Sequence, residues 1–201
     1  GTSKDIKYPG LNILPPGVER HVVNGGGLTG FQIFPDDEIE IINNEGNQIC
    51  EISAFNKDGK SELAILGLKE IKDNSEIKKI LFKKDETSLQ ALLQLKKRNL
   101  NIEKSKSSII FDKETKAGES IKLKSKDKCY CIFAAPGAEM LIHEQNPPTD
   151  LTIFVKRAKI TKDKEHHVIP DPMFDPLSET NIDRATAISF QVKEGDYIQV
   201  I

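Results

Sequence analysis

The sequence predicts a mainly β fold, an antiparallel β-sandwich or barrel-like domain with two short inserted α-helices. Apolar and polar residues alternate between residues 31 and 55 and again between residues 107 and 155. This period of two is typical of half-buried strands. Between these stretches the apolar residues recur at steps of three and four, which indicates helices.

The first half of the chain is expected to contain four strands. Residues 1–30 hold prolines and the glycine run Gly25-Gly26-Gly27, so they are expected to be extended and to lie over a core without building it. Three short antiparallel strands are expected within residues 31–55, with residues 43–46 as a hairpin turn. A fourth strand is expected over residues 61–68.

Two helices and four more strands complete the prediction. The helices are expected at residues 75–84 and 88–98, with Asn74 or Ser75 and then Thr87 as N-caps. The final strands are expected at residues 107–111, 119–124, 128–134 and 151–155.

The predicted domain organisation rests on an internal repeat. Residues 190–201 align without a gap on residues 31–42, with five of the twelve positions identical. We therefore expect a first domain over residues 1–158, a proline-containing linker over 159–184, and the first strands of an incomplete second copy over 185–201. The alternative is that the last strand completes the sheet of the first domain and that the match is a coincidence.

Composition restricts the partners and the compartment. Lys and Arg total 29 against 31 Asp and Glu, a net charge of -2, so no nucleic-acid partner is expected. No apolar run approaches the roughly 18 residues of a membrane span, and the first residues lack a secretory signal, so no membrane partner is expected. Three cysteines agree with a reducing compartment, and we expect a cytoplasmic protein.

Candidate reactive side chains are few. Cys129 and Cys131 share one face of an expected strand and are the candidate metal ligands, but zinc needs further ligands and buried core is the favoured interpretation. No metal centre is therefore predicted. His21 lies in the extended stretch without the sequence pattern of a Ser or Cys nucleophile, so no catalytic residue is predicted.

Two stretches resemble the urea-carboxylase-associated family of β-domains. Residues 30–62 match its opening pattern through the turn at residues 43–48 and the strand end Ala54-Phe55-Asn56. Residues 116–158 match its closing pattern through Gly118, Glu119, Ala135, Pro136, Pro148 and Thr149. The chain departs from the family at Ala135, where the family has Cys, at Asn43, where it has Asp, and in the shorter, lysine-rich middle region.

The resemblance also suggests where a small polar, amine-type ligand would bind. The implied ligand-binding residues lie in the turn, on the strand after it, and in the facing loop at residues 136–143: Asn43, Gln48, Glu51, Asn56 and His143. A carboxylate such as Glu51 pairs well with an ammonium or amidinium group. The alternative is that these residues only build a turn and a strand edge.

The expected function follows from the same resemblance. Residues 171–201 look like the join that precedes a second copy and a glycine-cleavage T-type aminomethyltransferase in larger proteins. We therefore expect a non-catalytic, N-terminal accessory or ligand-sensing domain of a folate-dependent aminomethyltransferase in one-carbon or amine metabolism. Its partners would be the downstream domains of the same polypeptide, with no cofactor in this chain and tetrahydrofolate in the parent protein.

Two other functions stay open at this point. One is an enzyme or enzyme subunit that hydrolyses C–N bonds of urea- or guanidine-like compounds, against which the alanine at position 135 argues. The other is a protein-interaction domain that uses its basic middle region, where charged groups could face an anionic partner.

Overall fold

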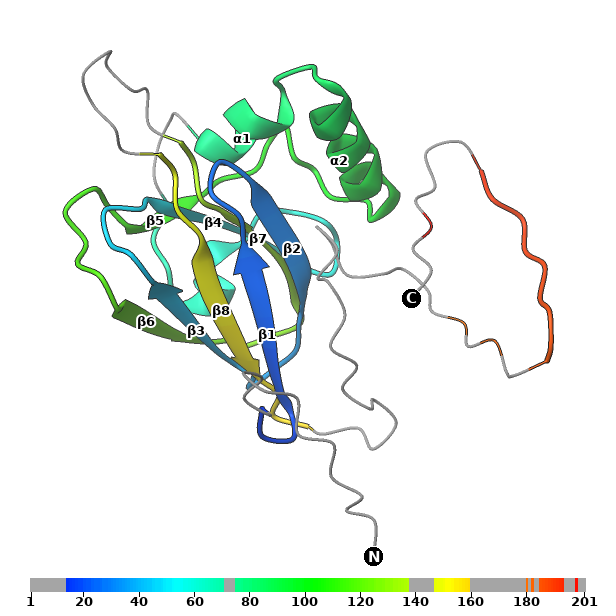
Figure 1. The fold of residues 1–201 in the computed structure, drawn as a ribbon, viewed down its shortest axis with the longest axis horizontal. Coiled ribbons are helices and arrows are strands. Elements are labelled where there is room, and N and C mark those ends of the chain that lie inside the picture. The colour runs from blue at the N-terminus through cyan, green and yellow to red at the C-terminus, as the bar shows by residue number, and fades with distance from the viewer. Residues whose placement is uncertain are drawn as a thin grey trace, which may run out of the picture.

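The computed structural model describes residues 14–70, 75–137 and 147–159, together with 180, 182, 185–193 and 198. In this part of the chain, eight antiparallel strands form two four-stranded sheets with two helices beside them, which confirms the predicted sandwich (Figure 1). Sheet A consists, in spatial order, of β1 (Val18–Val23), β8 (Leu151–Lys156), β3 (Glu38–Asn43) and β6 (Glu119–Lys124). Sheet B consists of β2 (Leu28–Ile33), β7 (Cys129–Ala134), β4 (Cys50–Phe55) and β5 (Ser108–Phe111).

Sheet A has one buried face and one solvated face. Ile39 and Ile41 of β3 and Ile153 of β8 point into the core between the sheets and are fully buried. The alternate residues point outward, where cross-strand ion pairs join Lys122 to Glu40 and Lys156 to Glu38. This is the inward-apolar, outward-polar alternation of an antiparallel sheet with one wet face.

The two central strands of sheet B, β4 and β7, are buried on both faces. Ile52 and Ala54 of β4 belong to the core between the sheets, whereas Phe55 belongs to a second core under the helices. In β7, Cys131 likewise faces sheet A and Ile132 faces the helices. Because both faces are covered, every residue of β4 and β7 is buried.

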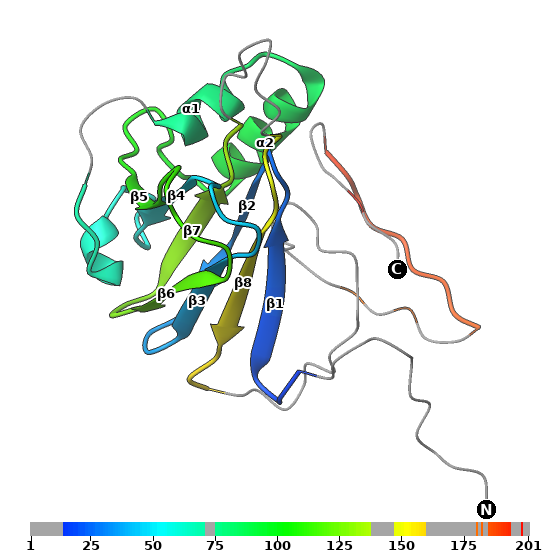
Figure 2. The same cartoon turned by 60° about the vertical axis from the view of Figure 1, so that its left-hand side comes forward.

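The helical layer covers the second face of sheet B. α1 (Glu76–Leu81) and α2 (Glu86–Lys97) lie side by side at one end of the strands, and α1 contacts β4 and β7 (Figure 2). Both helices fall where the apolar spacing predicts them. Ser75, one of the two residues predicted as the N-cap of α1, is that N-cap. The N-cap of α2 is not Thr87 but Asp85, whose carboxylate accepts a bond from the Ser88 amide.

The described part of residues 1–30 contains strands that the sequence does not predict. Residues 18–23 form β1 at the edge of sheet A, and β2 begins at Leu28, so the prediction that this stretch builds no core is wrong. The glycine run is the tight connection between these two strands. A Cβ at Gly25 would collide with the Pro148 carbonyl oxygen, so only glycine fits there.

Two strand predictions are also wrong. Residues 43–46 turn between β3 and β4, but these strands enter different sheets, so the turn closes no hairpin. Over residues 61–68 the chain makes only a bridge from Ser61 to Phe55 and the short 3-10 helix η1 (Leu63–Leu66). Leu63 and Leu66 there pack into the core between the sheets from its edge, which satisfies their apolar character without a strand.

The described part of the C-terminal stretch lies outside both sheets. Residues 185–193 belong to no strand, and their side chains are exposed. The predicted linker and second copy stay predictions, because residues 160–179 and most of 194–201 lie outside the described residues. Among the described helices, none has the length and apolar character that crossing a membrane requires.

Candidate functional site

Two of the predicted ligand-binding residues meet in the turn after β3. The Asn43 side-chain amide donates to the Gln48 carbonyl oxygen at 2.8 Å, and the Asn43 Oδ1 accepts from the Gly46 amide at 3.0 Å. Gly46 has φ +80°, and a Cβ there would lie 2.7 Å from the Ala117 nitrogen. Glycine is therefore needed at this position for both its conformation and its size.

Gln48 joins this turn to segments far away in the sequence. Its side chain is 4% exposed; Nε2 donates to the Pro136 carbonyl at 2.9 Å, and Oε1 accepts from the Thr149 amide at 2.7 Å. We call Asn43, Gly46, Gln48, Pro136 and Thr149 the Gln48 junction. The Thr149 hydroxyl oxygen is buried and has no hydrogen-bond partner among the described residues. The Gln48 junction therefore leaves one polar atom without a partner in this part of the chain.

Glu51 lies on the opposite face of sheet B, toward the helices. It is 2% exposed, and its carboxylate accepts from the Ser75 hydroxyl at 2.7 Å and from the Glu76 and Ile77 amides at 2.6 and 3.3 Å. These donors form the N-terminus of α1, where the helix dipole favours a negative charge. In the described structure Glu51 thus holds α1 to β4.

The remaining predicted ligand residues are elsewhere. Asn56 lies at the other end of β4, where Oδ1 accepts from the Asp58 and Lys60 amides and Nδ2 donates to Glu62. His143 lies outside the described residues. The structure therefore brings Asn43 and Gln48 together but not Glu51 or Asn56, and their role in ligand binding stays a prediction.

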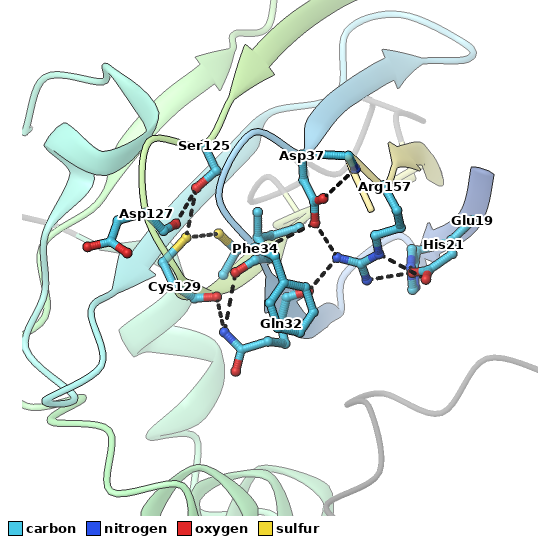
Figure 3. Close-up of polar contacts among 12 residues, drawn as sticks. Glu19, His21, Gln32, Phe34, Asp37, Ser125, Asp127, Cys129 and Arg157 are labelled. Carbon is cyan, nitrogen blue, oxygen red and sulfur yellow. Dashed lines mark hydrogen bonds and ion pairs between the residues drawn. The ribbon is translucent and has the colours of Figure 1, made fainter. Parts of the chain in front are cut away.

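A different group of polar side chains gathers at the opposite end of the sandwich. In β1, Glu19 pairs with Val155 and His21 pairs with Ile153, so both point inward with these core residues. Arg157, directly after β8, donates from Nε to Glu19 at 2.9 Å and from Nη1 to Asp37 at 2.6 Å (Figure 3). We call Glu19, His21, Gln32, Asp37 and Arg157 the Arg157 cluster.

The Arg157 side chain links the two sheets by hydrogen bonds. It donates to the Gln32 carbonyl of sheet B at 2.9 Å, while its bonds to Glu19 and Asp37 reach sheet A and the turn that leads into it. Asp37 is 1% exposed and also accepts from the amides of Phe34 and Ala158. A buried carboxylate with three donors is well compensated.

The charges of this cluster are strongly coupled. Burial alone would raise the pKa of Glu19, but hydrogen bonds from His21 and Arg157 and the charge of Arg157 lower that pKa to about 2. Burial opposes the charge of Arg157 as well, yet the bonds to Glu19 and Asp37 raise its pKa. Glu19 and Arg157 are therefore both charged near neutral pH.

His21 is the most chemically versatile member of the cluster. Its ring stacks on Phe31 with centroids 4.0 Å apart, and Nε2 lies 3.3 Å from Glu19 Oε2. Nδ1 has no hydrogen-bond partner among the described residues. A carboxylate that orients an imidazole leaves the second ring nitrogen for a ligand or a proton. The sequence of β1 has no apolar alternation that could have shown this inward pair, because Glu19 and His21 are themselves its inward residues.

The candidate metal ligands form a close pair of thiols next to this cluster. The sulfur atoms of Cys129 and Cys131 are 3.7 Å apart in the core between the sheets. Within the described residues, no group of three or more His, Cys, Asp and Glu side chains is arranged to hold a metal ion. The role of the two thiols as metal ligands and the tetrahydrofolate expected for a parent protein are not tested by this structure.

Comparison with known proteins gives one curated relative. No family model matches the chain. The chain is 34% identical over 197 residues to the trimethylamine-oxide aldolase of Ruegeria pomeroyi, an alignment that covers 98% of this chain and 25% of that protein. The chain thus spans about a quarter of the length of the curated relative it matches.

This similarity corrects the function expected from the sequence. The expectation of an accessory domain of a folate-dependent aminomethyltransferase is wrong, because the matched protein is named as an aldolase of trimethylamine oxide and not as a group-transferring enzyme. A role in glycine cleavage is likewise unsupported by this comparison. That expectation rested on residues 171–201, most of which lie outside the described residues. The comparison leaves the chain similar, over nearly its whole length, to a protein of amine metabolism.

Proposed function

We propose that this chain is part of an enzyme that acts on trimethylamine oxide or a closely related methylated amine oxide. The observation that carries the proposal is the 34% identity that extends over 98% of the chain. A match of this extent spans every described strand of both sheets, so it concerns a whole structural unit and not a shared motif.

Cleavage of trimethylamine oxide by an aldolase determines which groups a binding site must contain. Cleavage of trimethylamine oxide into dimethylamine and formaldehyde conserves every atom and needs no external oxidant. The substrate presents a cationic nitrogen with three methyl groups and an oxide oxygen that accepts hydrogen bonds. A suitable site therefore combines an aromatic face for the methylated cation with a donor for the oxygen.

The end of the sandwich at the Arg157 cluster supplies both features. The Phe34 ring is 45% exposed, with Arg157 Cζ 5.5 Å and Lys128 Nζ 5.7 Å from its centroid. His21, in the same cluster as Arg157, has a ring nitrogen without a partner among the described residues. We assign the methylated nitrogen to the face of Phe34 on this basis.

The first test is activity of the complete protein that contains this chain. We expect incubation with trimethylamine oxide to release dimethylamine and formaldehyde in equal amounts, followed by proton NMR. Trimethylamine, which lacks the oxide oxygen, should release neither. Absence of both products from trimethylamine oxide would contradict the proposed function.

The second test concerns the aromatic face. Phe34→Leu should raise the KM for trimethylamine oxide roughly tenfold, the effect of losing a cation–π contact of about 1.4 kcal/mol, and should change kcat less. Phe82→Leu is the matched control, because Phe82 is 43% exposed but belongs to the helical layer. Equal KM values in the two variants would remove Phe34 from the site and leave the activity itself unaffected.

We also propose a distant relationship to the urea-carboxylase-associated family. It is supported by the Gln48 junction, where residues from both resembling stretches bond to one another. An experimental structure of a member of that family tests this, since we expect the same glutamine to join the turn to the two proline-containing segments. A different pairing of these segments would contradict it.

A further inference from the structure

Cys129 and Cys131 occupy successive inward positions on β7. Side chains two residues apart lie on the same face of a strand, and here the two sulfur atoms are 3.7 Å apart. Both thiols are buried, at 1% and 0% exposure. Cys50 is the third thiol in the same core, and it provides an internal comparison because it is a buried free cysteine on β4.

The surroundings of the two thiols shift their pKa values in opposite directions. The Ser125 hydroxyl oxygen lies 3.6 Å from the sulfur of Cys129 and 2.6 Å from the Asp127 carbonyl oxygen, to which it donates (Figure 3). The hydrogen bond that the Cys131 thiol donates to the Cys129 sulfur is the main cause that lowers the pKa of Cys129 despite its burial. The bond to Cys129 and burial raise the pKa of Cys131. Burial, with the nearby Glu51 charge, also raises the pKa of Cys50.

Of the two buried thiols, Cys129 lies nearer the end of β7 and the exposed residues before it. Cys129 is the first residue of β7 and follows directly after residues 126–128, which are exposed. Cys131 lies one full strand repeat deeper, paired with Phe31 of β2 and Ala54 of β4. A water-sized reagent that enters past residues 126–128 therefore meets Cys129 before Cys131.

We propose that Cys129 and Cys131 are a peroxide-reactive dithiol that closes to a disulfide within β7. The Cys129 thiolate attacks hydrogen peroxide, the O–O bond breaks, and hydroxide leaves while sulfur becomes a sulfenic acid. The Cys131 thiol then attacks that sulfur, its S–H proton leaves with the hydroxyl group as water, and the S–S bond forms. The proton that the Cys129 thiol releases when it ionises joins the hydroxide to form water. In total the two thiols lose two electrons, and peroxide is reduced to two molecules of water.

The strand geometry makes this disulfide easy to reverse. Residues two apart on a strand have Cα atoms about 6.6–6.8 Å apart, at the upper limit of the separation that a disulfide spans. The sulfur atoms must also approach from 3.7 Å to about 2.05 Å. Closing the bond therefore tightens the pleat of β7, and a strained disulfide is readily reduced by added thiol.

The test uses the full chain and peptide mass spectrometry. After treatment with hydrogen peroxide, unfolding and alkylation, we expect the peptide with both cysteines to be two hydrogen atoms lighter and unalkylated. The Cys50 peptide should be fully alkylated. Dithiothreitol should restore alkylation of Cys129 and Cys131. Peroxide treatment that leaves both thiols alkylated, or a disulfide that includes Cys50, would overturn the proposal.

Single variants test the order of the two steps. In Cys131→Ser, the sulfenic acid on Cys129 has no thiol to react with, so dimedone should label Cys129. In Cys129→Ser, dimedone should label neither remaining thiol. Cys50→Ser should form the disulfide at the wild-type rate. Labelling of Cys131 in Cys129→Ser at the rate seen for Cys129 would contradict the assigned order, and circular dichroism confirms that each variant is folded before the reaction.

Discussion

Glu19 illustrates how one inward-facing charge depends on its partners. A carboxylate on the inner face of a strand would be costly without compensation. Here Arg157 donates two hydrogen bonds to it, and His21 lies 3.3 Å away. Since these interactions favour the ionised form and lower the pKa of Glu19 to about 2, they also contribute to folding stability wherever Glu19 is charged.

The first prediction is a pH dependence that Glu19 causes. Its pKa is about 2 when folded and 4.5 in its ordinary state, so the contribution is complete above about pH 4.5 and is lost as the pH falls toward 2. For a carboxylate fully shielded from solvent, a pKa shift of this size corresponds to about 3 kcal/mol of folding stability. The partial exposure of Glu19 reduces this to on the order of 2 kcal/mol. Urea unfolding between pH 2 and pH 7 measures it.

The variant Glu19→Gln isolates this contribution. It should be less stable than wild type at pH 7, and the difference between the two proteins should shrink as the pH falls from about 4.5. Glu40→Gln is the matched control, because Glu40 pairs with Lys122 on the solvated face of sheet A at 3.5 Å. A constant difference between wild type and Glu19→Gln over this pH range would contradict the assignment.

At the scale of elements, α1 is too short to be stable alone. It has six residues, fewer than an isolated helix needs in water. Its N-terminus is completed by Ser75 and by the Glu51 carboxylate, which comes from a strand of sheet B. Ile77 and Leu81 then bury its apolar face. The helix therefore exists because β4 provides a negative charge and an apolar surface next to each other.

The second prediction is that Glu51→Gln loosens α1. The amide keeps an acceptor but loses the charge and directs N–H groups toward other donors, so the free energy of unfolding should fall by about 2 kcal/mol. Hydrogen exchange should accelerate first in residues 76–81. Asp85→Ala, which removes the acceptor of the Ser88 amide at the N-terminus of α2, is the control, and it should accelerate exchange in residues 86–97 instead. Unchanged exchange in α1 after Glu51→Gln would show that packing alone holds the helix.

The elements also show how far the sequence predicts the fold. Strands whose inward positions are apolar and whose outward positions are charged, such as β6 with Ile121 and Lys122, were predicted at their observed bounds. β1 was missed because Glu19 and His21 occupy its inward positions, so apolar and polar residues do not alternate along it. The hairpin at residues 43–46 was wrong because local turn chemistry does not determine which sheet a strand enters.

The candidate site was less predictable than the fold. Asn43, Gln48 and Glu51 were predicted as ligand-binding residues, and that role stays a prediction. The structure shows instead that Gln48 makes long-range hydrogen bonds and that Glu51 completes the N-terminus of a helix, and a sequence pattern reveals neither contact. The Arg157 cluster joins residues up to 138 positions apart. No spacing along the chain encodes such a contact, because it depends on the pairing of β1 with β8.

At the scale of the whole molecule, sheet B is shared by two cores. Ile52 of β4 and Ile132 of β7 are both fully buried in central strands of this sheet, but Ile52 faces sheet A and Ile132 faces the helices. The helices have their apolar contacts in the second core, whereas the sheets are held together by the first. The two layers should therefore open separately, since local stability follows the number of buried contacts.

The third prediction compares the two cores directly. Ile52→Ala and Ile132→Ala remove the same atoms from equally buried positions, and each should lower the free energy of unfolding by about 2–5 kcal/mol. Native-state hydrogen exchange should distinguish them. Ile132→Ala should accelerate exchange in α1 and α2 well before sheet A, because sheet A makes no contribution to the core that this residue occupies. Ile52→Ala should accelerate exchange in both sheets together. If Ile132→Ala opened sheet A as readily as the helices, the sandwich and the helical layer would form a single cooperative unit, and the division into two cores would have no thermodynamic meaning.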